Sequence, residues 1–125
     1  MSPRKLMMIA ALFGASAVAC GAFGAHALRE TLTAARLDTW QTAAHYQLVH
    51  AVALAAIAAW WAHKPNAPGL RVAGVAITVG VLVFSGSLYA LCLSGVTILG
   101  AITPIGGVAL IVGWLALLSS VARTP

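Results

Sequence analysis

The stretch between Arg71 and Arg123 contains no charged residue and no histidine. It is about 50 residues long, whereas a helix needs only about 20 residues to cross the hydrocarbon core of a bilayer. The stretch therefore has room for two membrane spans with a short turn between them. We expect that turn between Ser94 and Thr103, where Thr103 as a cap and Pro104 at the first helical position predict the start of a new helix.

The composition of the whole chain agrees with a membrane protein. Of its 125 residues, 62% are hydrophobic and 7% are charged. Soluble domains average about 25% charged residues, and disordered chains are rich in charge and poor in apolar residues. The apolar runs also lack the alternation of apolar and polar residues that marks a transmembrane β-strand. The sequence therefore predicts an all-α integral membrane protein.

Four spans divide the chain into an expected four-helix bundle, with residues 1–125 forming a single transmembrane domain. A breaker with two prolines and a glycine, Lys64 to Gly69, separates the second and third spans. The basic N-terminus followed by an apolar run also resembles a secretory signal. We expect a retained span instead, because the apolar run continues past Cys20 as far as Leu28. The predicted spans are residues 6–27, 43–62, 72–93 and 104–121.

The segment from Leu28 to Thr42 connects the first two spans and holds both acidic residues of the chain, Glu30 and Asp38. Apolar residues at helical spacing predict a short helix lying in the membrane interface. An ordinary solvated loop is the alternative. Asp38, with Gln41 three residues later, resembles a capping box for the second span.

Charge predicts the orientation. The formal net charge is +5, but the basic residues lie between the apolar runs and form no single patch, so we expect no nucleic-acid partner. Five basic residues fall on the side of the termini and two on the other side. Basic residues favour the cytoplasmic side, which predicts cytoplasmic N- and C-termini and a location in a bacterial inner (plasma) membrane. The five are Arg4, Lys5, Lys64, Arg71 and Arg123.

Rows of small residues predict close helix packing, because small side chains let helix backbones approach in lipid. The first span carries two such rows, the third has Gly80 and Gly86, and the fourth has Gly106, Gly107 and Gly113. Cys20 and Cys92 lie in apolar stretches without a CxxC spacing and are expected to be small core residues.

Polar side chains inside the spans are few, and nearly all fall in the half remote from the termini. Such groups are costly in a membrane, so they normally have partners or a function. At about 100° per residue, Tyr46, Gln47 and His50 share one face of the second span, and Ser85 and Tyr89 share one face of the third. As a hypothesis, they form one polar pocket that opens to the outer side, with His26 near its rim. The candidate ligand-binding residues are His26, His45, Tyr46, Gln47, His50, Ser85, Ser87 and Tyr89. The alternative is that they only hydrogen-bond between helices.

Catalysis is the least supported class. Both acidic residues lie outside the predicted spans, and no HExxH, P-loop or GxSxG motif is present. No catalytic residue, cofactor or metal site is predicted. A bis-histidine haem site would need two histidines at equal depth, which only His26 and His45 approximate, and a zinc or copper site would need further ligands.

Six segments of the chain, taken in order, carry a resemblance to a known family. They are Gly21–Leu28, Thr42–Gln47, His50–Leu54, Phe84–Tyr89, Thr103–Gly107 and Gly113–Leu115. Together they resemble domain-of-unknown-function family 423, the YgdD-like inner membrane proteins, and the resemblance covers nearly the whole chain. It implies an integral membrane protein with several helices and no particular reaction.

Two functions from different classes follow from these observations. The first is a structural or accessory membrane protein that lies in the lipid bilayer and binds another membrane protein or a copy of itself. The second is a binding or transport site for a small molecule, lipid or quinone in the polar pocket. A metal or haem site is a weaker third hypothesis.

Overall fold

The computed structural model describes all 125 residues and contains helices and no strands. Four helical segments are long and apolar enough to cross a membrane, which confirms the predicted all-α fold and the number of spans. Each predicted span lies within one of these segments. In chain order the elements are α1 (Pro3–Val18), η1 (Ala19–Gly24), α2 (Ala25–Ala27), α3 (Ala34–His63), α4 (Leu70–Ser94), η2 (Thr97–Ala101) and α5 (Thr103–Ala122).

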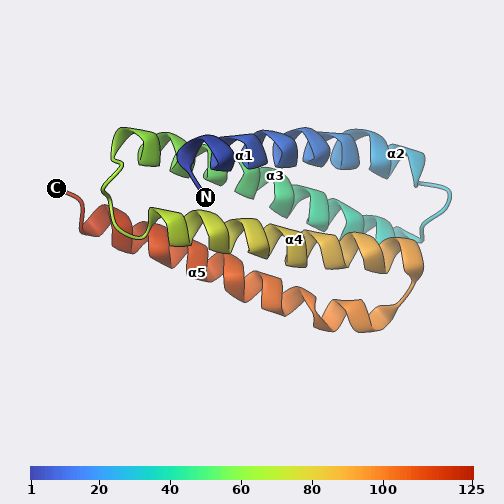
Figure 1. Cartoon of the computed structure of the whole chain (residues 1–125). Coiled ribbons are helices and arrows are strands. Elements are labelled where there is room, and N and C mark those ends of the chain that lie inside the picture. The colour runs from blue at the N-terminus through green and yellow to red at the C-terminus, as the bar shows by residue number, and fades with distance from the viewer.

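The spans run antiparallel and pack in chain order: α1 against α3, α3 against α4, and α4 against α5 (Figure 1). The largest core cluster joins all four and includes Leu6, Leu54, Ile77 and Leu110. α3 and α4 form the centre, with α1 and α5 flanking them. Half of the apolar window of α3 is buried inside the protein, compared with 22% for each flanking span. Polar side chains on the buried faces of α3 therefore have helix neighbours instead of lipid.

The expected interfacial helix over Leu28 to Thr42 is wrong. The chain makes turns after α2, and α3 then runs without interruption from Ala34, so the second half of this segment is simply the start of the second span. The predicted cap is also wrong. Thr33 has an extended backbone, and its hydroxyl accepts a hydrogen bond from the Arg36 N–H at 3.2 Å. Asp38 lies one turn inside the helix, where no free N–H group needs a cap.

The last span also begins differently from the prediction. Thr103 is the first residue of α5, Pro104 follows it, and Ile102 occupies the cap position without a side-chain hydrogen bond. The short 3₁₀-helix η2 leads directly into this span. Thr103 uses its hydroxyl to bond α4, as described below.

Within the first span, the π-helix η1 keeps the buried residues before and after it on the same face of the helix. Ala17 and Ala25 are both buried, although eight residues separate them. In an α-helix, residues eight apart lie about 80° from each other. A π-helix has wider turns, with bonds between residues i and i+5. The wider turns bring Ala25 back to the face that packs on α3.

Glycines permit the close packing of α4 against α5. A Cβ atom at Gly80 would lie 2.9 Å from the backbone nitrogen of Leu110, and one at Gly106 would lie 2.8 Å from Phe84 Cα. At Gly113 it would lie 3.2 Å from the carbonyl oxygen of Ala73. By contrast, a Cβ atom at Gly86 would meet nothing within 4 Å, and one at Gly107 would be 3.8 Å from the Phe84 ring. Only some members of the predicted small-residue rows therefore make helix contacts.

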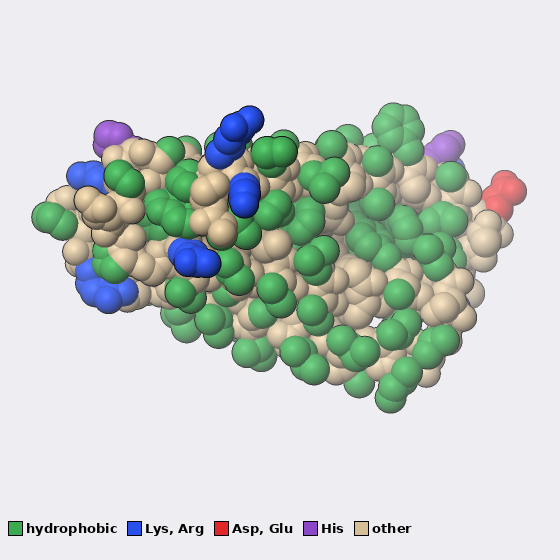
Figure 2. Space-filling model, viewed as in Figure 1, with side chains coloured by type: hydrophobic (Ala, Val, Ile, Leu, Met, Phe, Trp, Pro, Cys, Tyr) green, Lys and Arg blue, Asp and Glu red, His purple; other side chains and the backbone are tan.

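Hydrophobic side chains cover most of the face seen in Figure 2, and charged side chains on it are few. Lys and Arg gather over the half that carries the N-terminus, the α3–α4 loop and the C-terminus, whereas an acidic side chain lies at the opposite end. This arrangement is typical of a protein whose middle section lies in hydrocarbon.

Candidate functional site

Gln47 is the centre of a hydrogen-bond network that joins three helices. Its side chain is only 6% exposed. Its Nε2 atom donates to the Phe13 carbonyl oxygen at 3.0 Å and to Ser16 Oγ at 2.7 Å, both on α1. Its Oε1 atom accepts from the Tyr89 hydroxyl of α4 at 2.8 Å. Both amide donors and the acceptor of Gln47 are therefore bonded within the protein.

Tyr89 continues this network into an aromatic cluster. Its ring centroid lies 4.6 Å from that of Trp40, at the start of α3. The Trp40 Nε1–H donates to the Cys20 carbonyl oxygen in η1 at 2.8 Å. A Cβ atom at Gly24 would lie 3.1 Å from the Trp40 ring, so glycine makes room for the indole there. The cluster ties the π-helix to α3 and α4.

Ser85 lies close to Gln47 but bonds elsewhere. It is 1% exposed, and its hydroxyl donates to the Ala43 carbonyl oxygen on α3 at 2.8 Å. As predicted, Ser87 lies on another face of α4: its Oγ is 2.6 Å from Thr103 Oγ1 of α5. The two serines therefore attach α4 to its two neighbours.

His50 forms a second polar group together with α5. Its Nδ1 atom lies 2.7 Å from the Tyr46 carbonyl oxygen, and its Nε2 atom accepts from the Trp114 Nε1–H at 3.1 Å. A carbonyl can only accept, and an indole N–H can only donate. These partners together fix a neutral imidazole with its proton on Nδ1. The Tyr46 ring packs against Phe84 of α4, with the centroids 4.5 Å apart.

Of the other two candidate histidines, His26 lies outside both groups, whereas His45 lies beside the second one and lines a small surface pocket with Tyr46, Val49 and His50. His26 is exposed, and its Nδ1 is 3.0 Å from an Arg29 guanidinium nitrogen. His45 is also exposed. The structure brings no three His, Cys, Asp or Glu side chains into a group that could hold a metal ion.

The single outward-opening pocket that the sequence predicted is not formed. Gln47 faces α1 and α4, whereas His50 faces α5, because α3 is central and buries more than one face. A groove of about 350 Å³ does lie beside Gln47 between α1 and α4. Leu12 and Leu82 in its lining are 67% and 59% exposed, so it faces the lipid side. Its lining residues are Leu12, Phe13, Ser16, Gln47, Val81, Leu82, Ser85, Gly86 and Tyr89.

Sequence reasoning missed several participants. No role is predicted for Trp114, although a tryptophan within an otherwise apolar span is itself a signal that its N–H needs a partner. Ser16 lies in the first span, for which the sequence predicts only close packing through small residues. The Phe13 and Cys20 carbonyl oxygens give no sequence signal, because every residue has a carbonyl.

The architecture defines a class: this is a multi-pass integral membrane protein whose intramembrane polar side chains connect its helices. Residues 20–107 match the family described as protein of unknown function (DUF423), and the chain belongs to that family.

Similarity to curated relatives extends over nearly the whole chain. It is 43% identical to a UPF0382 membrane protein of Staphylococcus saprophyticus, over 91% of this chain and 93% of the relative. It is 37% identical to the UPF0382 membrane protein YwdK of Bacillus subtilis (96% and 98%) and 35% identical to the UPF0382 inner membrane protein YgdD of Escherichia coli K12 (98% and 93%). These names confirm the predicted family and inner-membrane location. No solved structure matches the chain.

Proposed function

We propose that this protein is a structural or accessory membrane protein, which binds a second copy of itself or another membrane protein through its lipid-facing helices. The observation that carries the proposal is the internal use of the polar side chains. Gln47, Ser85, Ser87 and His50 each bond another helix of the same chain. Side chains that hold helices together are not free to bind and release a ligand, and hydrogen bonds of this kind stabilise helix association in membranes.

Replacing His50 by alanine tests this proposal. We expect His50→Ala to lower the free energy of unfolding in detergent by about 2 kcal/mol, because the variant loses two hydrogen bonds and leaves a cavity beside Trp114. Thermal melting gives the stability, and native mass spectrometry of the same samples gives the oligomeric state and any retained molecule. The control is Val52→Ala, since Val52 is exposed on the same helix and does not line the pocket beside His50.

A His50→Ala protein that melts like the wild type but has lost a co-purifying molecule would contradict the structural proposal and favour ligand binding. A wild-type protein that is monomeric and free of protein partners in every detergent and lipid mixture would contradict the accessory role.

A second candidate function is the binding of a lipid or quinone in the groove between α1 and α4. One observation favours it: Gly86 lines this groove, and a Cβ atom there would meet no atom within 4 Å. Tyr89 and Ser16 provide hydroxyl groups beside the apolar walls. An apolar molecule with one polar group fits such a lining.

The substitution Gly86→Leu would fill this groove. We expect it to leave the melting temperature unchanged or to raise it by a few degrees, because the added side chain enters open space and leucine favours a helix over glycine. If the groove binds a lipid or quinone, native mass spectrometry will show that this molecule is lost in Gly86→Leu and retained in Ala15→Leu. Ala15 is exposed on α1 and does not line the groove. Equal retention in both variants would contradict the groove as a binding site.

We also propose that both termini lie in the cytoplasm. The end that carries them holds five basic residues and no acidic side chain, and excess Lys and Arg marks cytoplasmic loops. A cytoplasmically active reporter, such as a fluorescent protein, fused after Arg123 should be active, and a reporter that requires export should be inactive. The reverse result would invert the orientation.

A further inference from the structure

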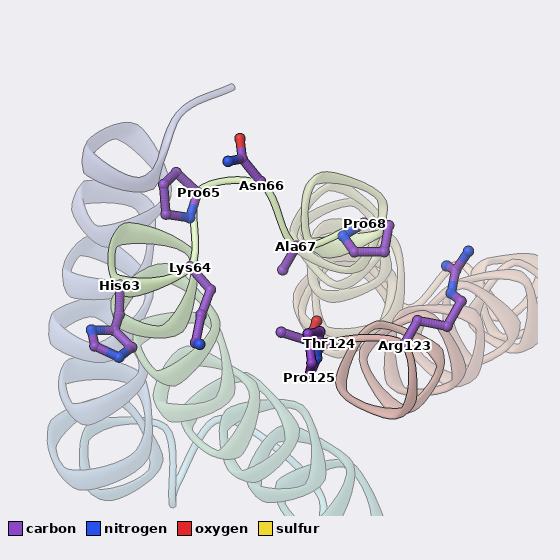
Figure 3. Close-up of a pocket in the computed structure, with 9 residues that line it drawn as sticks. All are labelled: His63, Lys64, Pro65, Asn66, Ala67, Pro68, Arg123, Thr124 and Pro125. Atoms are coloured by element: carbon purple, nitrogen blue, oxygen red, sulfur yellow. The ribbon is translucent and has the colours of Figure 1, made fainter.

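A pocket of about 280 Å³ lies at the basic end of the molecule, between the α3–α4 loop and the end of α5 (Figure 3). It is separate from the groove beside Gln47, and the proposed function does not use it. Proline, threonine and asparagine residues form much of its wall. Its lining residues are His63, Lys64, Pro65, Asn66, Ala67, Pro68, Arg123, Thr124 and Pro125.

Lys64 is the half-buried cation in the lining of this open pocket. Its residue is half-buried, and Figure 3 shows its side chain directed into the space between the end of α3 and the residues Thr124 and Pro125. Glu30 and Asp38, the acidic residues of the chain, lie at the opposite end of the molecule, in the turns after α2 and in the second turn of α3. No carboxylate side chain is therefore available to neutralise Lys64.

Helix ends of both signs meet at this pocket: α4 begins here, whereas α3 ends with Lys64 as its cap residue and α5 ends with Arg123. The full charges of Lys64 and Arg123 outweigh the two partial negative charges, so the potential stays positive. α4 starts beside Pro68, and its cap residue Gly69 makes no side-chain hydrogen bond to the free N–H groups of the first turn. The N-terminus of a helix carries a partial positive charge. Arg123 points away from Lys64, and its Nε donates to the Ser119 carbonyl oxygen at 3.2 Å. Its charge therefore offsets the partial negative charge at the C-terminal end of α5 and adds to the positive potential at the pocket, although its guanidinium group does not face Lys64.

The position of the pocket identifies its ligand. α3, α4 and α5 all begin or end here, so the pocket lies where the apolar spans give way to the polar interface. Phosphate groups of phospholipids occupy this level of a bilayer, and basic pockets between transmembrane helices bind anionic headgroups. We propose that the pocket binds a phosphate ester, and specifically the phosphodiester of an anionic phospholipid, with Lys64 as the main contact.

The test compares two variants that remove the same charge at the same end of the molecule. Lys64→Gln removes the half-buried cation that lines the pocket, and Lys5→Gln removes an exposed one outside it. Each protein carries its purification tag at the N-terminus, because Pro125 lines the pocket. Melting temperatures are measured in neutral detergent with phosphatidylglycerol, with phosphatidylcholine and with inorganic phosphate. Native mass spectrometry counts the retained phosphatidylglycerol molecules.

We expect phosphatidylglycerol to stabilise the wild type more than phosphatidylcholine does, and we expect Lys64→Gln to lose at least half of this difference while Lys5→Gln keeps it. Lys64→Arg, which retains the charge, should keep it as well, so a general defect of Lys64→Gln can be recognised. Equal losses in Lys64→Gln and Lys5→Gln, or no preference for phosphatidylglycerol, would overturn the proposal. Equal stabilisation by inorganic phosphate would overturn the lipid as the ligand and assign the pocket to free phosphate.

Discussion

The variant Gly106→Ala is expected to lower the free energy of unfolding by about 3 kcal/mol, the upper part of the range for overpacked sites. The added Cβ atom would lie 2.8 Å from Phe84 Cα. Because the obstacle is backbone, no side-chain rotation can relieve the contact, and α4 and α5 must separate. Thermal melting or denaturant titration in a fixed detergent measures the loss.

Gly107→Ala is the matched control for this prediction. The neighbouring glycine gains the same methyl group, but its nearest contact is the Phe84 ring at 3.8 Å, an ordinary packing distance. Alanine also favours helix by up to about 1 kcal/mol over glycine, so this variant should be neutral or slightly stabilised. Equal destabilisation by both substitutions would contradict the close contact of α4 and α5 at Gly106.

The second large effect is expected for Gln47→Leu, which should destabilise the protein by about 2 kcal/mol. Leucine keeps most of the volume but removes three hydrogen bonds. Interhelical bonds in membranes average about 0.6 kcal/mol each, and the Tyr89 hydroxyl would also lose its acceptor in an apolar setting.

Gln41→Leu is the control, because Gln41 is exposed on the same helix. We also expect Gln47→Leu to increase the mobility of Tyr89, which hydrogen exchange of the α4 backbone near it would detect. If Gln47→Leu melts at or above the wild-type temperature, Gln47 is not a structural link, and the binding interpretation of the groove gains support.

Helical periodicity predicted part of the candidate site. It placed Ser85 and Tyr89 together and excluded Ser87, and the structure agrees, since Ser87 bonds α5 instead. It also grouped Gln47 with His50, which the structure separates. Spacing gives the angle between two side chains on a helix, but it does not say how many neighbours that helix has.

The pattern of residues does not give the exact boundaries of the helices or the backbone carbonyl groups that accept side-chain hydrogen bonds. Thr33 and Asp38 are both good cap residues, and the choice between them depends on where the chain turns after α2. Likewise, the partner of Trp40 is the Cys20 carbonyl oxygen, which only the three-dimensional arrangement of η1 and α3 reveals. The number of spans needed no such information, because length and apolar character determine it.

The wide turns of η1 show how this chain can absorb a change in length. An ordinary α-helix with one residue fewer between Ala17 and Ala25 would present the same two alanines to α3, since seven residues make nearly two full turns. Packing alone therefore does not require the additional residue. What it changes is local: the Cys20 carbonyl oxygen accepts both the Ala25 N–H and the Trp40 indole. Deletion of one residue from η1 would therefore keep Ala17 and Ala25 on the face that packs on α3, but it would disturb the hydrogen bond of the Trp40 indole. We expect this segment to tolerate a change in length, with the loss of the Trp40 contact as the only local effect.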